Sequence, residues 1–90
     1  MKMSKKVVRA KFSVGDYVQW YSQAGGRGKH KIGRVLAVIP AGQHVLDYLP
    51  AGLSIKYGYG MPRNHESYLV QVGMGIRLYW PRVSQLDIYN

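Results

Sequence analysis

Cysteine is absent from this chain of 90 residues, which excludes both disulfide bonds and thiolate metal sites. A domain of this size has only a modest hydrophobic core. Its stability must then come from side-chain packing or from an oligomer. The eight tyrosines and two tryptophans favour packing. We therefore expect a single domain built around one core.

Acidic residues are also scarce, because four Asp and Glu stand against 13 Lys and Arg, for a formal net charge of +9. This charge favours anionic partners such as phosphate backbones. No pair of carboxylates suggests acid–base catalysis and no serine lies in a nucleophile elbow, so we do not expect an enzyme. The histidines His30, His44 and His65 lie in predicted loops without metal-ligand spacing, and we expect neither a metal nor a cofactor.

Long apolar stretches are missing as well. No run approaches the roughly 18 residues that a membrane span requires, and the basic N-terminus lacks the apolar segment of a signal peptide. We expect a soluble, cytoplasmic protein. Residues 1–11 are rich in lysine and arginine. This basic N-terminal tail is either a solvated segment or an arm that lies along phosphates.

The clearest structural signal is the segment from Lys31 to Pro40. Its unbroken apolar run, Val35–Ile39, has no helical period and ends at a proline, as expected for a central strand that is buried on both faces. Gly33 suits a close approach of two backbones. Alternating apolar residues predict further strands at 17–21, 67–72 and 76–80, and a short last strand that contains Leu86 and Ile88. In the first of these strands, Tyr17 and Tyr21 are expected to point outward.

Proline at the start of residues 81–85 predicts one helical turn before the last strand. The sequence thus predicts an all-β domain over residues 12–90, a small SH3-like barrel of about five strands. In the strand at 76–80, Ile76 is expected to share the inward face with Leu78 and Trp80. The expected core combines strand parity with apolar character: it contains Val18, Trp20, Val35, Ala37, Ile39, Val70, Leu78 and Leu86.

Residues 41–66 form a long insertion without clear periodicity, in which residues 45–49 suit one helical turn. We expect an excursion from the barrel, ordered mainly by its own apolar contacts. Long connections are often functional, and this one interleaves aromatic and basic side chains. It either covers one end of the barrel or serves as a partner-binding loop, whose candidate residues are Tyr48, Lys56, Tyr57, Tyr59 and Arg63.

A second aromatic and basic set surrounds residues 22–31, a stretch whose glycines and cations predict a flexible hairpin loop. Bases stack on aromatic faces while lysine and arginine follow the phosphates, an arrangement that tolerates many sequences. We expect Arg77 and Tyr79 to point away from the core and to join this loop in one surface. The candidate nucleic-acid-binding residues are Tyr21, Arg27, Lys29, Lys31, Arg77, Tyr79 and Arg82.

The segment VGDYVQWYS at Val14–Ser22, with Gly-Gly-Arg at 25–27 and Tyr-Leu-Val at 68–70, resembles the hypervirulence-associated TUDOR-domain family. The resemblance covers about residues 12–39 and 67–88, leaves out the insertion, and implies an SH3/TUDOR-like barrel without a well-defined ligand. Gly15–Val18 and Ile76–Tyr79 are similar in fold position to segments of the plasmid-encoded dihydrofolate reductase. That family's site requires a glutamine where this chain has Arg77, so this second resemblance concerns the fold only.

Two functions follow from these observations. The first is a nucleic-acid-binding module with weak sequence preference, for DNA or RNA. The alternative is a protein-interaction accessory factor or inhibitor, of the kind that phages and mobile elements encode, which docks on a nucleoprotein complex. The first predicts binding to polyanions that weakens steeply with salt, and the second predicts a partner that survives nuclease treatment.

Overall fold

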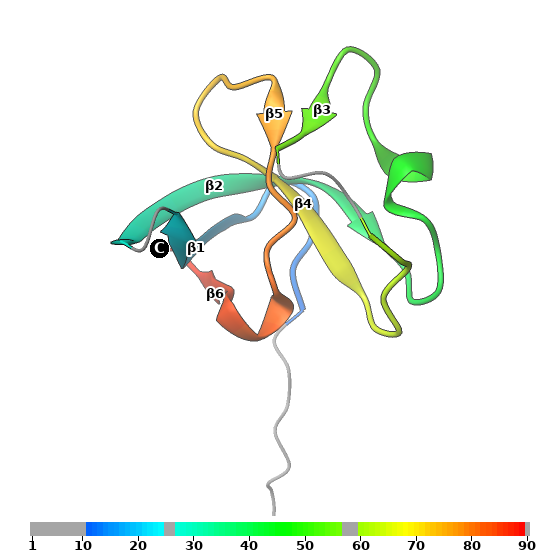
Figure 1. The fold of residues 1–90 in the computed structure, drawn as a ribbon, viewed down its shortest axis with the longest axis horizontal. Coiled ribbons are helices and arrows are strands. Elements are labelled where there is room, and N and C mark those ends of the chain that lie inside the picture. Colours follow the sequence, from blue (N-terminus) through cyan, green and yellow to red (C-terminus); the bar gives the residue numbers. More distant parts are fainter. Residues whose placement is uncertain (1–10, 25–26, 57–59, 90) are drawn as a thin grey trace, which may run out of the picture.

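The computed structural model describes residues 11–24, 27–56 and 60–89 (Figure 1). The predicted basic tail therefore lies, apart from Lys11, outside the described residues, as do Tyr57 and Tyr59. The strands and short 3₁₀ helices follow in the order β1 Tyr17–Ala24, β2 Arg27–Ile39, η2 Val45–Tyr48, β3 Ser54–Ile55, β4 Ser67–Gln71, β5 Arg77–Leu78, η3 Val83–Gln85 and β6 Asp87–Ile88.

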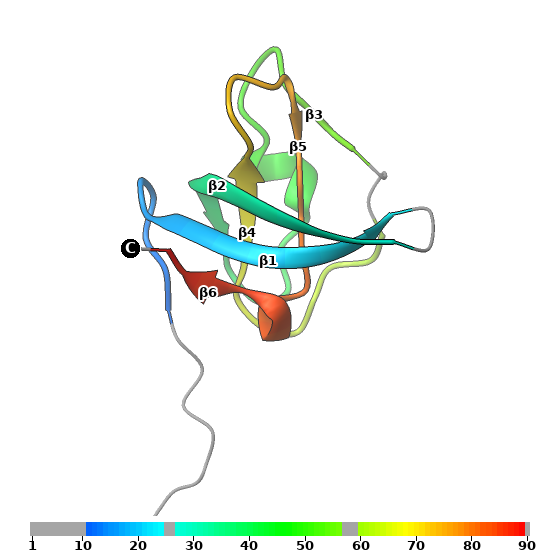
Figure 2. The same ribbon diagram turned by 90° about the vertical axis from the view of Figure 1, so that its left-hand side faces the viewer.

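Strand β2, with 13 residues, is the longest of these elements and pairs with β1 on one side and β4 on the other. The antiparallel sheet has the order β4-β2-β1-β6, and Figure 2 shows β1 between β2 and β6. This confirms the central strand. A β-carbon on Gly33 would lie 2.6 Å from both the Gln71 carbonyl oxygen and Val70 Cγ1. Glycine is therefore required where β2 passes close to Val70 and Gln71.

The prediction of a flexible loop at residues 22–31 is wrong. Strands β1 and β2 stay paired as far as Ala24 and Arg27. The composition of this stretch suggests a loop because the far half of the hairpin extends beyond the hydrophobic core and carries polar side chains. Its register is continuous with the ladder that pairs Val18 with Gly33 and Trp20 with Lys31, so the strands persist without an apolar face of their own.

Strand β4 separates two groups of buried side chains. Its residues Ser67, Tyr68, Leu69 and Val70 are all buried. Tyr68 and Val70 belong to the first group. Its other members are Phe12, Val18, Trp20, Val35, Val83 and Leu86. Leu69 faces the second group, whose members are Ile39, Val45, Leu69 and Leu78. The expected single core is therefore two cores on opposite faces of one strand.

The insertion at 41–66 forms part of the second core, which corrects the expectation of an independent excursion. Val45 is only 1% exposed and packs with Leu69 of β4 and Leu78 of β5. Leu49 and Leu53 pack at the edge of the same group. In Figure 1, η2 and β3 lie on one side of β4, while β6 and η3 lie on the other. Without the insertion, the Leu69 face of β4 would be exposed to water.

Of the predicted core, Ala37 alone is only half-buried, because the pairing of β2 with β4 shifts register between Val35 and Ala37. The predicted strand 76–80 is also shorter than expected. Arg77 and Leu78 pair in parallel with β3, and Tyr79 forms an isolated antiparallel bridge with Val70. Ile76 is exposed, so its predicted inward orientation is wrong.

The predicted helical turn is confirmed as η3, and the short last strand as β6, which pairs with β1. The turn expected at residues 45–49 is confirmed as η2. The described part of the chain is a small, mostly-β domain with an antiparallel four-stranded sheet and a small parallel pair, and it contains no closed barrel and no full helix. None of the helices in the described ranges is long and apolar enough to cross a membrane.

Replacing Val45 with alanine tests whether the insertion supports the fold. The change removes buried methyl groups and leaves a cavity beside Leu69, which should lower the free energy of unfolding by about 2 kcal/mol. The matched control is Leu46→Ala at the next position, where the side chain is 43% exposed and the change should be within about 0.5 kcal/mol. Urea denaturation measures both. Equal effects of the two substitutions would contradict the two-core arrangement.

Candidate functional site

The register of the β1–β2 hairpin divides the residues that were expected to form one binding surface. Residues opposite one another in an antiparallel pair project from the same face of the sheet. Lys31 lies opposite the buried Trp20, and Lys29 lies opposite Ser22. Tyr21 lies opposite His30, on the other face. The side chain of Arg27 is outside the described residues. The expected surface is therefore split between two faces of one hairpin.

On the inner face, Tyr79 packs against the first core. The expectation that its side chain points away from the core is wrong. Its ring meets the Trp20 indole edge-on, with the ring centroids 5.7 Å apart. The ammonium groups of Lys31 and Lys56 lie 5.0 and 5.5 Å from the centroid of its ring. Lys56 Nζ also donates a hydrogen bond of 3.5 Å to the Tyr79 hydroxyl. An indole and two cations already contact this ring, which makes Tyr79 a poor platform for a base.

The surroundings of Tyr79 shift its pKa. Burial on its own raises the pKa of the phenol, but the nearby Lys31 and Lys56 together outweigh it. The pKa of Tyr79 is consequently below its ordinary value of 10.0. The phenolate is favoured because it can accept hydrogen bonds from two ammonium groups.

Arg77 is exposed and lines, with Lys56 and Tyr79, a pocket of about 310 Å³.

The outer face of the sheet carries a row of exposed aromatic side chains. Tyr17 is 52% exposed and Tyr21 is 63% exposed, which confirms that both point outward. Tyr89 is 42% exposed. Its backbone N–H donates a 2.8 Å hydrogen bond to the carbonyl of Tyr17, so it continues the β1–β6 pairing. Arg34 lies opposite Tyr17 on β2. Three tyrosines and an arginine therefore share this face.

The ring of Tyr21 is supported on one side by His30. It stacks on the imidazole of His30 with a centroid distance of 5.0 Å and an interplanar angle of 23°. His30 Nε2 and Gln19 Oε1 are 2.8 Å apart, and Gln19 Nε2 donates to the Ile88 carbonyl at 3.1 Å. This chain of contacts connects β2, β1 and β6. These contacts therefore fix the positions of the Tyr21 and His30 side chains in the absence of a ligand.

We call the set of Tyr17, Tyr21, His30, Arg34 and Tyr89 the outer aromatic face. Of its members, the sequence-based prediction included only Tyr21. The outward orientation of Tyr17 and Tyr89 could have been predicted from strand parity. His30 was missed because the part of the hairpin that contains it was predicted as a loop. Arg34 lies in the predicted central strand, and only the hairpin register places it opposite Tyr17.

The remaining candidates lie apart from this face. Arg82 is exposed and lies near Arg63, whose guanidinium stacks on the Trp80 ring at 3.7 Å. Tyr48 packs at the edge of the second core and Lys56 contacts Tyr79. The described residues of the predicted partner-binding loop are thus dispersed over three places. In the described ranges, no three His, Asp or Glu side chains converge as metal ligands.

A scan of protein-family models, a search of curated proteins and a search of solved structures returned no significant match to this chain. The resemblances to the TUDOR-domain and reductase families therefore stay predictions.

The lowered pKa of Tyr79 predicts a pH-dependent contribution to stability. Because the pKa is lower in the folded than in the unfolded state, ionisation of Tyr79 stabilises the fold at high pH, and this contribution is lost as the pH falls through the folded-state pKa. The stability difference between wild type and Tyr79→Phe should hence grow as the pH approaches about 10.

Urea denaturation of both proteins over this pH range measures the difference, and tyrosinate absorbance reports the ionisation directly. The wild-type absorbance should begin to rise at lower pH than that of Tyr79→Phe. Superimposable titration curves, after correction for one tyrosine, would contradict the proposed environment of the phenol.

Proposed function

We propose that the protein is a nucleic-acid-binding module with weak sequence preference, which binds single strands on the outer aromatic face. The observation that carries the proposal is the exposure of Tyr17, Tyr21 and Tyr89 on the solvent side of one small sheet. Every base has a flat π-face, so exposed aromatic rings on a sheet bind unpaired bases with little regard to sequence.

The support beneath Tyr21 favours binding. A ring that must be ordered on binding reduces the affinity, whereas a ring that is already fixed avoids this cost. Tyr21 is stacked on His30, and His30 contacts Gln19. The Tyr21 side chain is more than half exposed, and the ring face opposite His30 is the one proposed to stack on a base. It provides a rigid surface for one base.

Charge supports the same proposal. The chain has a formal net charge of +9, and the outer aromatic face itself contains Arg34. Phosphates that approach the tyrosines therefore meet this cation, together with the carboxylate of Asp87, which lies opposite Gln19 in the β1–β6 pairing. Counterion release makes such binding dependent on salt. Lys29 and Lys31, on the inner face of the hairpin, contribute to the wider positive field and not to contacts with stacked bases.

We also propose that the fold is of the SH3-like type. The strand order supports this: β1, β2 and β4 follow one another in the sheet, and the Val70–Tyr79 bridge continues it toward β5. The chain then passes through η3 and returns as β6 beside β1. This order of strands and helical turn is the one expected from the sequence for a small SH3-like barrel.

A second candidate function is docking on another protein, and one observation favours it. Met74 and Ile76 are exposed apolar side chains at the turn between β4 and β5. Ile76 also lines the pocket that contains Arg77. Such a turn suits an interaction with a protein partner, in line with an accessory factor that docks on a nucleoprotein complex.

The test is a salt titration of fluorescent single- and double-stranded oligonucleotides against wild type and Tyr21→Ala. Loss of the stacking ring should weaken binding to single strands by about 1–3 kcal/mol, or roughly 5- to 150-fold, and binding to duplex much less. Tyr21→Phe keeps the ring and should retain most of the affinity. Tyr79→Phe changes a tyrosine outside the face and should bind as wild type.

Charge is tested separately with Arg34→Gln, which should lower the slope of log affinity against log salt by about 0.7 on single strands if Arg34 contacts one phosphate. Absence of binding at about 0.1 M salt, or an equal loss on single strands and duplex for Tyr21→Ala, would overturn the proposal. A protein partner that is retained after nuclease treatment but lost in a Met74→Ser, Ile76→Ser variant would favour the docking function instead.

A further inference from the structure

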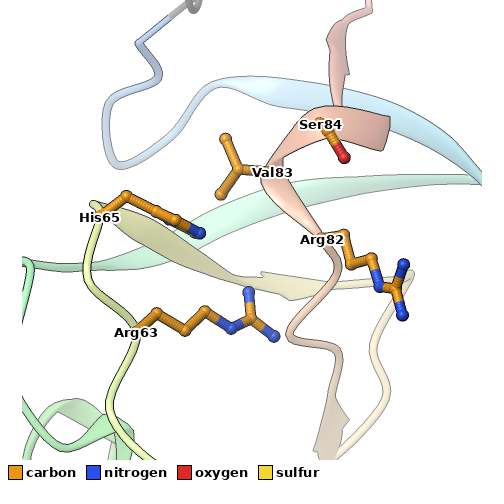
Figure 3. Close-up of a pocket in the computed structure, with 5 residues that line it drawn as sticks. All are labelled: Arg63, His65, Arg82, Val83 and Ser84. Carbon is orange, nitrogen blue, oxygen red and sulfur yellow. The ribbon is translucent and has the colours of Figure 1, made fainter.

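A separate pocket of about 400 Å³ lies between the chain that enters β4 and the chain at η3. Figure 3 shows its lining, in which Arg63 reaches from one stretch toward the other, where Arg82 and Ser84 lie. The full lining consists of Arg63, His65, Arg82, Val83 and Ser84. Four of these five side chains are polar or cationic. No carboxylate is present among these described lining residues.

The Arg63 guanidinium is held in a fixed position. It lies 3.7 Å from the centroid of the Trp80 ring. One terminal nitrogen donates to the Pro81 carbonyl at 2.9 Å, and the other donates to the Trp80 carbonyl at 2.8 Å. A guanidinium carries five N–H donors, so these two hydrogen bonds leave others for a ligand. Stacking and two carbonyl contacts thus orient the planar fork before binding.

Arg63 and Arg82 both line the pocket, and no carboxylate among the described lining residues balances them. In Figure 3 the Arg82 guanidinium is directed away from that of Arg63. Burial, and secondly the positive charge of Arg82, lower the pKa of Arg63. The carboxylate nearest in sequence is Glu66, whose Oε1 pairs with Lys11 Nζ at 3.8 Å. Glu66 is not part of the pocket lining. An anion in the pocket would relieve the repulsion between the two guanidinium groups.

The other polar groups suit an oxyanion with several oxygens. Ser84 carries a hydroxyl that can donate a hydrogen bond. His65 Nδ1 lies 3.1 Å from the Glu66 carbonyl oxygen, which leaves the other ring nitrogen on the pocket side, where Figure 3 shows the ring tip. A carboxylate has two oxygens and one charge. A phosphate monoester has three terminal oxygens and up to two charges, and it matches two arginines and a hydroxyl better.

We propose that this pocket binds a phosphate monoester, with Arg63 and Arg82 as the charged donors and Ser84 and His65 as supporting polar contacts. The inference goes beyond the proposed function and does not depend on it, because none of the pocket residues belongs to the outer aromatic face. The phosphate belongs either to a small molecule, such as a mononucleotide, or to the phosphorylated end of a nucleic-acid strand.

The experiment titrates inorganic phosphate into ¹⁵N-labelled protein and follows the arginine Nε–Hε signals by NMR, with acetate at equal ionic strength as the comparison anion. Phosphate should shift the Arg63 and Arg82 signals saturably at millimolar concentration or below, and acetate should bind at least about tenfold more weakly. Arg82→Gln should weaken phosphate binding by about tenfold or more.

The matched control is Arg77→Gln, which removes the same charge from an exposed arginine outside the pocket and should bind phosphate as wild type does. Arg63→Lys keeps the charge but loses the fork, and it should weaken binding if the protein stays folded. Equal weakening by Arg82→Gln and Arg77→Gln, or shifts that do not saturate by about 10 mM, would overturn the proposal, because both describe general attraction by a basic protein.

Two further arms separate the sources of the phosphate. A 5′-phosphorylated oligonucleotide that binds more tightly than its 5′-hydroxyl counterpart, with the difference lost in Arg82→Gln, assigns the pocket to strand ends. A mononucleotide that binds as tightly as the phosphorylated strand assigns it to small molecules. Tyr21→Ala should leave binding of inorganic phosphate unchanged, so failure of the outer aromatic face and failure of the pocket are distinguished.

Discussion

The burial of β4 on both faces is the constraint on which the rest of this structure depends. Ser67 to Val70 are four consecutive buried residues, and a strand of this kind needs cover on each side. The cover on one side comes from β1 and η3 with the flanking Phe12 and Leu86, and on the other from β5 and the insertion, which includes η2. The buried Ser67 hydroxyl accepts a hydrogen bond of 2.9 Å from the Trp80 indole N–H, so this buried polar group is satisfied.

Short apolar alternations made much of this fold predictable. Strand parity identified Val18, Trp20 and Val70 as core residues and placed Tyr17 and Tyr21 outside, because in a strand the inward and outward positions follow from counting by two. The insertion was not predictable in the same way. Its apolar residues follow neither the strand nor the helix period, and only the three-dimensional position of Val45 against Leu69 shows that they complete a core.

The candidate sites also differ in how far they could be predicted from local sequence patterns. The outer aromatic face depends on hairpin register, which composition concealed, since a polar hairpin beyond the core carries no periodic apolar signal. The proposed phosphate pocket depends on Arg63, a residue of the insertion, which contacts Trp80 from a distant part of the chain. Contacts of this kind have no local sequence pattern. The resemblance to barrel families covered the strands and omitted the insertion, and so it could not indicate this pocket.

The pairing of β6 with β1 has a kinetic consequence. Tyr89 and Tyr17 lie next to each other in space but near opposite ends of the described chain, and contacts between such distant residues form slowly because a large loop must close first. The β1–β2 hairpin is local by comparison. We therefore expect the stacked Tyr21 and His30 to belong to an early-forming unit, and Tyr89 to join them only when β6 pairs with β1. The complete aromatic row is thus a late product of folding, and a partially folded chain presents an incomplete one.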